Sequence, residues 1–126
     1  MTQEEKELVL QDLLGRLPYG VTIKDEYGDY INVNLYTANL EHLIDRVGSG
    51  IDKLALRSFE SMNMDERIGI YDLVYKLFTI YYMDIVINGN DNLPPIYDWV
   101  NRNNFDWRHL IKKGLAVEMP EDLYNS

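Results

Sequence analysis

Apolar residues in the first segment of the chain recur at intervals of three and four, the period of a helix with one buried face. These residues are Leu8, Val9, Leu13, Leu14 and Leu17. Thr2 and Glu5 have the spacing of a capping box, and Pro18 and Gly20 follow the last apolar position. We therefore predict an amphipathic helix from Thr2 to Leu17.

The pattern then changes to the alternation of a β-strand. Val21 and Ile23 begin an alternating run that leads into DEYGD, residues 25–29, where the glycine suits a positive φ. Residues 30–36 alternate as well, with apolar side chains on one side of the strand: Ile31, Val33 and Leu35. The two runs predict a half-buried hairpin.

Residues 39–47 are ambiguous between helix and strand. Their apolar positions have helical spacing, Asn39 suits an N-cap, and Gly48 suits a C-terminal stop. The run is short enough for sheet pairing to override it. We predict a helix here, with a strand as the alternative, and a further short strand between Ile51 and Phe59.

The longest regular pattern runs from Asn63 to Asn88. Asn63 and Glu66 have capping-box spacing, and a stripe of core positions follows them: Ile70, Val74, Leu77, Phe78, Tyr81 and Ile85. A second apolar row flanks this stripe: Tyr71, Tyr75, Phe78, Tyr82 and Val86. Charged residues interrupt the helix at about turn intervals and would be costly in lipid. We predict a long helix outside the membrane that is apolar over more than one face.

Two shorter helices are expected near the C-terminus. Pro94 and Pro95 suit the first turn of a helix that carries Ile96, Trp99 and Val100. Asp106 stands where the N-cap of a second helix belongs, and Gly114 suits its C-cap. The whole chain is expected to form one α+β domain over residues 1–126. Its elements would be an N-terminal helix, a small antiparallel sheet, a long central helix and two short C-terminal helices.

Composition narrows the classes of function. The chain has 126 residues and no cysteine, which excludes a thiol nucleophile and any cysteine-based metal centre. Its formal net charge of −9 repels phosphate backbones, so we do not expect direct nucleic-acid binding. The acidic N-terminal segment is not that of an export signal, and a cytoplasmic location is expected. No pattern indicates a cofactor.

Two histidines raise the question of catalysis or metal binding. Asp106, Arg108 and His109 lie within four positions and contain the groups that a small hydrolase would use to hold an anion and move a proton. The same residues also suit a capped helix, with Arg108 and His109 on its outer face. His42 has Glu41 and Asp45 nearby, but the sequence shows no second cluster that would complete a metal site. We favour the structural interpretation of both histidines.

Two motifs near the ends of the chain carry a resemblance to a family. RLPYGV, residues 16–21, and FDWRHLIKKGLA, residues 105–116, resemble the end signatures of small uncharacterised proteins from gut Bacteroidales bacteria and their phages. Trp107 replaces a tyrosine of the second signature, and His109 replaces a glycine. The resemblance implies a phage or mobile-element setting and favours a sheet-rich stretch from Val21 to Phe59. It implies no activity, because the family has none assigned.

These observations leave two functional hypotheses. The first is a non-catalytic protein–protein interaction protein, whose partner is another protein or a second copy of the chain. Its binding residues would be Tyr71, Tyr75, Phe78 and Tyr82, unless the C-terminal helices with Trp99 and Trp107 cover them. The alternative is a small hydrolase-type enzyme that uses Asp106, Arg108 and His109.

Overall fold

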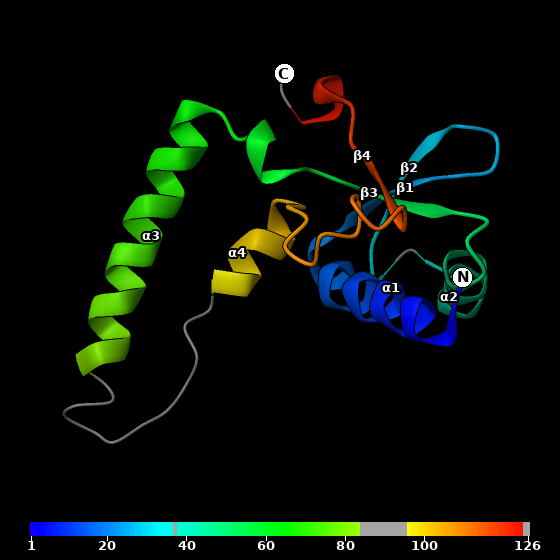
Figure 1. The fold of residues 1–126 in the computed structure, drawn as a ribbon, viewed down its shortest axis with the longest axis horizontal. Coiled ribbons are helices and arrows are strands. Elements are labelled where there is room, and N and C mark those ends of the chain that lie inside the picture. The colour runs from blue at the N-terminus through cyan, green and yellow to red at the C-terminus, as the bar shows by residue number, and fades with distance from the viewer. Residues whose placement is uncertain (37, 84–95, 125–126) are drawn as a thin grey trace.

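The computed structural model describes residues 1–36, 38–83 and 96–124, and it does not describe the side chains of residues 74, 76–83 and 96–98. The fold is α+β, with an N-terminal helix and a four-stranded mixed sheet. Helices α1 and α2 lie together at one end of the molecule, and α3 lies at the other end beyond α4 (Figure 1).

The N-terminal helix α1 spans Gln3–Arg16 and begins at the predicted capping box. The Thr2 hydroxyl accepts from the amide of Glu5 at 3.1 Å, and the Glu5 carboxylate accepts from the amide of Thr2 at 2.9 Å. A 3₁₀ turn, η1, spans Leu17–Tyr19 and is followed by Gly20 at φ 93°. Only glycine adopts this backbone conformation readily, so Gly20 redirects the chain from α1 into the sheet.

The sheet has the strand order β2-β1-β3-β4. β1 (Val21–Lys24) and β2 (Tyr30–Val33) form the predicted hairpin, with Gly28 at φ 86° in its turn. β3 (Lys53–Leu56) pairs antiparallel with β1, whereas β4 (Ala116–Glu118) pairs parallel with β3. The expectation of a purely antiparallel sheet is therefore wrong. The fourth strand is only three residues long and joins the sheet from the far end of the sequence, so no local pattern marked it.

The ambiguous segment is a helix, α2 (Leu40–Gly48). The Asn39 side chain accepts from the amide of His42 at 3.2 Å, as an N-cap does. Leu43 and Val47 are buried against α1 and the sheet, so packing supports the helical period rather than overriding it. The sheet-rich stretch that the family resemblance favoured is thus interrupted by this helix.

One apolar core joins α1, α2 and one face of the sheet. It contains side chains from the two helices and three of the strands, together with residues of the C-terminal segment: Val9, Leu13, Leu17, Val21, Ile23, Leu43, Val47, Leu54, Leu56, Leu110, Leu115 and Ala116. The core therefore depends on both ends of the chain, which bring α1 and β4 to the same sheet.

Beyond the sheet, a 3₁₀ turn η2 (Phe59–Ser61) leads into helix α3 (Met64–Met83). The predicted capping box is present, since the Asn63 side chain accepts from the amide of Glu66 at 2.8 Å and Glu66 accepts from the amide of Asn63 at 3.2 Å. The last positions of the predicted range, 84–88, and the two prolines at 94 and 95 lie outside the described residues. Helix α4 spans Ile96–Arg102.

The predicted second C-terminal helix is not formed. Residues 107–113 make successive turns, and the chain ends its described part in a short 3₁₀ turn, η4 (Glu121–Leu123). His109 has φ 60°, which lies in the left-handed region and breaks a right-handed helix at that point. The capping residues of the predicted helix therefore organise a compact loop instead.

Candidate functional site

Asp106 uses its carboxylate to hold the turns of residues 107–113, which we call the Asp106 loop. One oxygen accepts from the amide of Leu110 at 2.8 Å, and the other accepts from the amide of Ile111 at 2.9 Å. The Asp106 side chain is buried. Both oxygens are thus engaged by backbone groups, which is the role of a cap, although the turns replace the predicted helix.

The side chain of Arg108 reaches α1. Its guanidinium donates to Asp12 at 2.6 Å and lies over the ring of Trp107, 3.8 Å from the centroid. Among the described residues no hydrogen bond joins the His109 ring to Asp106 or Arg108. A depression of about 320 Å³ is lined by Asp106 and His109 but not by Arg108. The structure therefore does not bring the three hydrolase candidates together at one point.

Asp12 is the centre of a buried charge cluster that the sequence analysis missed. Asp12 and Arg16 have fully buried side chains and form a bidentate pair at 2.7 and 3.1 Å. Arg16 also donates to the backbone carbonyl of Phe105 at 2.6 Å, and Arg108 donates to the second side of the Asp12 carboxylate. We call Asp12, Arg16 and Arg108 the Asp12 cluster. It ties the first end motif of the sequence to the second.

A second arginine anchors α3 to the sheet. Arg57 follows β3 and forms a bidentate pair with Glu66 at 2.6 and 2.7 Å. Its guanidinium lies over the rings of Phe105 and Tyr124, at 4.4 and 3.7 Å from their centroids. The hydrogen bonds from Arg57 lower the pKa of Glu66 below its ordinary value of 4.5. Sequence reasoning identified Glu66 as a capping residue but not as the partner of Arg57.

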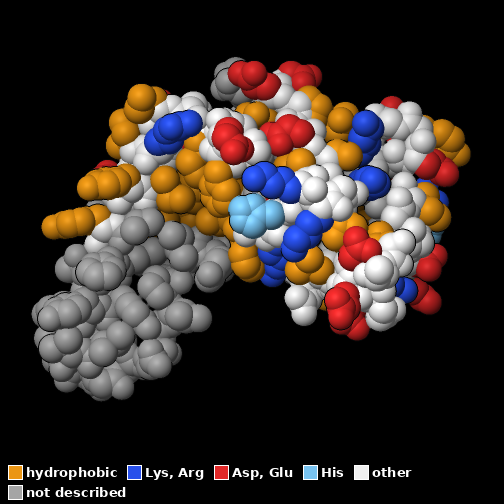
Figure 2. All heavy atoms as spheres, in the orientation of Figure 1, with side chains coloured by type: hydrophobic (Ala, Val, Ile, Leu, Met, Phe, Trp, Pro, Cys, Tyr) orange, Lys and Arg blue, Asp and Glu red, His pale blue; other side chains and the backbone are white. Residues whose placement is uncertain are grey.

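The outer side of α3 presents large apolar side chains to solvent. The exposed fractions are 70% for Met64, 54% for Ile68, 74% for Tyr71 and 70% for Tyr75. These residues follow one another at intervals of four, three and four, so they form one row along the helix. Figure 2 shows hydrophobic side chains projecting from this helix, on the side away from the rest of the fold. We call Met64, Ile68, Tyr71 and Tyr75 the α3 outer face.

Of the four binding residues predicted from the sequence, Tyr71 and Tyr75 thus belong to this exposed row. The side chains of Phe78 and Tyr82 lie outside the described residues. The opposite side of the helix is less exposed, with Ile70 and Leu73 partly buried. The first half of α3 therefore has one side toward the molecule and one apolar side toward solvent.

Trp99 and Trp107, which the sequence suggested as cover for this row, make contacts elsewhere. The Trp99 ring stacks on Phe105 with centroids 5.6 Å apart. The Trp107 indole donates to the side chain of Asn101 at 2.9 Å. Trp99 thus contacts Phe105 and Trp107 contacts α4, while Tyr71 and Tyr75 keep most of their surface exposed.

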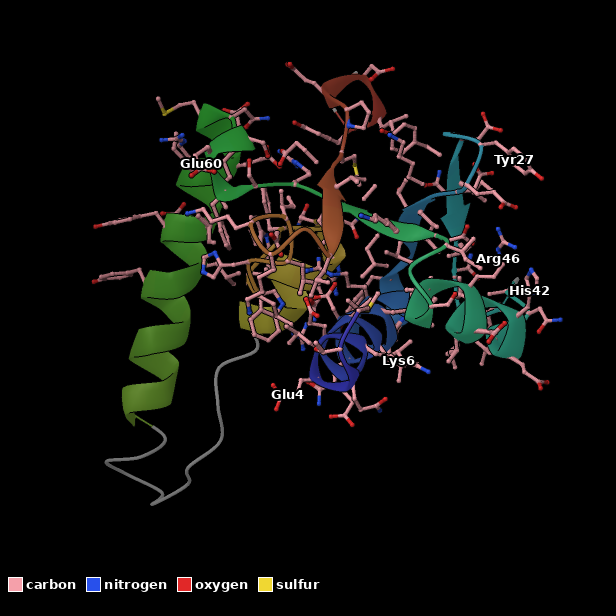
Figure 3. The ribbon with its side chains drawn as sticks, turned by 45° about the vertical axis from the view of Figure 1, so that its right-hand side comes forward. Glu4, Lys6, Tyr27, His42, Arg46 and Glu60 are labelled. Atoms are coloured by element: carbon pink, nitrogen blue, oxygen red, sulfur yellow. The ribbon has the colours of Figure 1, made fainter. Side chains whose placement is uncertain are left out.

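A cavity of about 440 Å³ lies between the β1–β2 hairpin and α2. Its floor contains Ile23, Ile31 and Leu43. Arg46 lines the rim and donates to Asp52 at 2.9 and 3.2 Å and to Glu26 at 3.1 Å, and these hydrogen bonds raise the pKa of Arg46. Figure 3 shows Arg46 and His42 on α2 and Tyr27 at the tip of the hairpin. Arg46, Glu26 and Asp52 are thus paired with one another.

His42 is a candidate metal ligand because Glu41 and Asp45 lie near it in the sequence. Within the described residues, no group of three or more histidine, aspartate or glutamate side chains is placed to hold an ion. The same part of the chain contains no helix with the length and apolar character needed to cross a membrane.

Comparisons of the chain with protein-family models, with curated proteins and with solved structures find no match.

Proposed function

We propose that the chain is a non-catalytic protein–protein interaction protein that binds through the α3 outer face. The observation that carries this proposal is the row of four large apolar side chains, each more than half exposed. These side chains keep more than half of their surface in water. Burying one of them against a partner would contribute about 1.5–3 kcal/mol.

The shape and chemistry of the row suit a protein partner. Apolar residues at intervals of four and three form a narrow stripe that packs against another helix. Tyrosine and methionine are enriched in protein interfaces, because a tyrosine ring can be buried while its hydroxyl remains hydrated. A single exposed apolar residue has no such meaning, but four in one row form a continuous patch.

The setting that we propose is a phage or mobile element, and the location is the cytoplasm. The support for the setting is the resemblance of residues 16–21 and 105–116 to the end signatures of the Bacteroidales family. The Asp12 cluster gives these two motifs a common structural role, because Arg16 and Arg108 share one carboxylate. Direct nucleic-acid binding is not proposed, since the net charge of −9 opposes it.

The proposal is tested by purification of tagged variants from the cells that carry the gene. The double variant Tyr71→Lys/Tyr75→Lys should lose a protein that co-purifies stoichiometrically with the wild type and is identified by mass spectrometry. The matched control is Tyr36→Lys, because Tyr36 is 90% exposed but lies outside α3. If all three forms retain the same bound proteins, or none, the α3 outer face is not the binding surface.

A further inference from the structure

We propose that the α3 outer face binds a second copy of this chain, with the two α3 helices side by side and parallel. This inference rests on the proposed function, because it uses the same face and names its occupant. Three features of the molecule support a second copy as the occupant: the heptad spacing of the face, the charges beside it and the position of α3.

The spacing of the face is that of a two-helix seam. Met64, Ile68, Tyr71 and Tyr75 occupy successive d, a, d and a positions of a heptad. The repeat of 3.5 residues keeps such a row turned toward a partner helix of the same kind. Phe78 and Tyr82 continue the same spacing in the sequence. Every copy of the chain carries the same row on α3, so a second copy offers a seam that matches the first.

The charged residues beside the seam select the parallel orientation. Arg67 occupies a g position and Asp72 occupies the next e position, and both are exposed. In a parallel pair, a g residue faces the e residue five positions further along the other helix. Arg67 of each copy would therefore face Asp72 of the other copy, which gives two ion pairs related by the two-fold axis.

In the antiparallel orientation the charged residues beside the seam would repel one another. In that arrangement e positions face e positions, so Asp65 of one copy would lie beside Asp72 of the other. Two carboxylates facing one another repel, and the two-fold axis would repeat the repulsion. The charge pattern thus favours the parallel pair through both attraction and repulsion.

The position of α3 leaves room for a second copy. In Figure 1, α3 lies at one end of the molecule, with α4 between it and the sheet. The hydrophobic side chains in Figure 2 project from α3 on the side away from the sheet and helices α1 and α2. Two chains joined along this side place their sheets on opposite sides of the helix pair, where they do not meet.

Charge exchange tests the pairing. Sedimentation equilibrium of Arg67→Asp and of Asp72→Arg, each alone, should show a dimer dissociation constant at least tenfold higher than that of the wild type. An equimolar mixture of the two variants should recover the dimer, because a heterodimer restores both ion pairs. Lys112→Asp, an exposed change of the same charge, is the matched control and should leave the dissociation constant unchanged.

Engineered thiols test the orientation, because the chain has no cysteine of its own. Met64→Cys should form a disulfide-linked dimer under mild oxidation, since two d positions at the same level of a parallel pair lie close together. In an antiparallel pair, position 64 lies opposite position 75. The introduced thiols would then be about 16 Å apart along the axis, too far for a disulfide. Tyr36→Cys is the control for random collision.

The outcomes separate this inference from the proposed function. A wild type that stays monomeric at high concentration, while the Tyr71→Lys/Tyr75→Lys variant loses another identified protein, overturns the second copy and leaves the interaction surface in place. A dimer without disulfide formation by Met64→Cys overturns the parallel orientation. A monomer that also binds no other protein through α3 overturns both proposals.

Discussion

The Asp12 cluster and the α3 outer face each reverse the usual distribution of residues. The first region buries the charged side chains of Asp12 and Arg16 beside a partly buried Arg108, and the second exposes four large apolar side chains. The difference lies in their partners. Asp12 pairs with both Arg16 and Arg108, and Arg16 also donates to the carbonyl of Phe105. The apolar row on α3 leaves most of its surface to solvent. The charged groups of the first region pair within the fold and serve structure, whereas we propose that the apolar row of the second region serves a partner.

The largest effect is expected from removing the shared carboxylate of the Asp12 cluster. Asp12→Ala leaves the buried guanidinium of Arg16 without its counter-charge, so the free energy of unfolding should fall by about 3–5 kcal/mol. Urea denaturation measures this change. The double variant Asp12→Leu/Arg16→Met removes both charges and should be less destabilised than the single variant. A single variant as stable as the wild type would show that the cluster is not structural.

A smaller loss is expected at the Asp106 loop. Asp106→Ala leaves the amides of Leu110 and Ile111 without their acceptor, and the free energy of unfolding should fall by about 1–3 kcal/mol. Asp106→Asn keeps one carbonyl acceptor and should lose less. If Asp106→Asn abolished an enzymatic activity without changing stability, the carboxylate would have a chemical role, and the hydrolase hypothesis would replace the structural one.

The backbone at His109 predicts a gain in stability. His109 has φ 60°, a conformation that glycine adopts without strain. His109→Gly should therefore raise the free energy of unfolding by about 1 kcal/mol. His109→Ala keeps the strain and serves as the control. Equal stability of the two variants would show that the conformation of His109 is not strained.

The anchor between Arg57 and Glu66 predicts a dependence on pH. The pKa of Glu66 is lowered below 4.5 in the folded chain, so its contribution to stability is complete above pH 4.5 and is lost as the pH falls through the folded pKa. Glu66→Gln should flatten the acid limb of a plot of stability against pH. Glu4→Gln, at an exposed glutamate of α1, should leave the limb unchanged. Identical limbs for the wild type and Glu66→Gln would exclude this contribution.

The smallest effect on stability is expected on α3. Tyr71→Lys changes a side chain that is 74% exposed, so the free energy of unfolding of the isolated chain should change by about 0.5 kcal/mol or less. Denaturation at a concentration too low for association measures this value. A loss comparable to that of Asp106→Ala would mean that the tyrosine supports the fold, and the contrast between the two regions would disappear.

Local signals predicted much of this fold. Thr2 with Glu5, and Asn63 with Glu66, form the capping boxes that their spacing indicated, and Asn39 caps α2. These features depend on residues three positions apart, so a sequence displays them directly. The hairpin turn is marked in the same way by Gly28.

Features that depend on distant residues could not be predicted from one sequence. Strand β4 pairs with β3 across about sixty positions, and three residues carry too little pattern to reveal a parallel strand. The i, i+4 spacing of Asp12 and Arg16 could have suggested their ion pair. The link to Arg108 could not be seen, because the two ends of the chain meet only in the folded state. The exposure of Tyr71 and Tyr75 likewise depended on where the two tryptophans pack.

Photo-cross-linking from α3 in living cells tests whether the α3 outer face binds a protein. A photoreactive phenylalanine analogue replaces Tyr71 in one form of the protein and Tyr36 in another, and cross-linked products are identified by mass spectrometry. We expect one defined protein–protein product from position 71, which is a dimer of the chain itself if α3 binds a second copy, and no such product from position 36. No product from position 71, or the same products from both positions, would show that the α3 outer face is not a protein-binding surface.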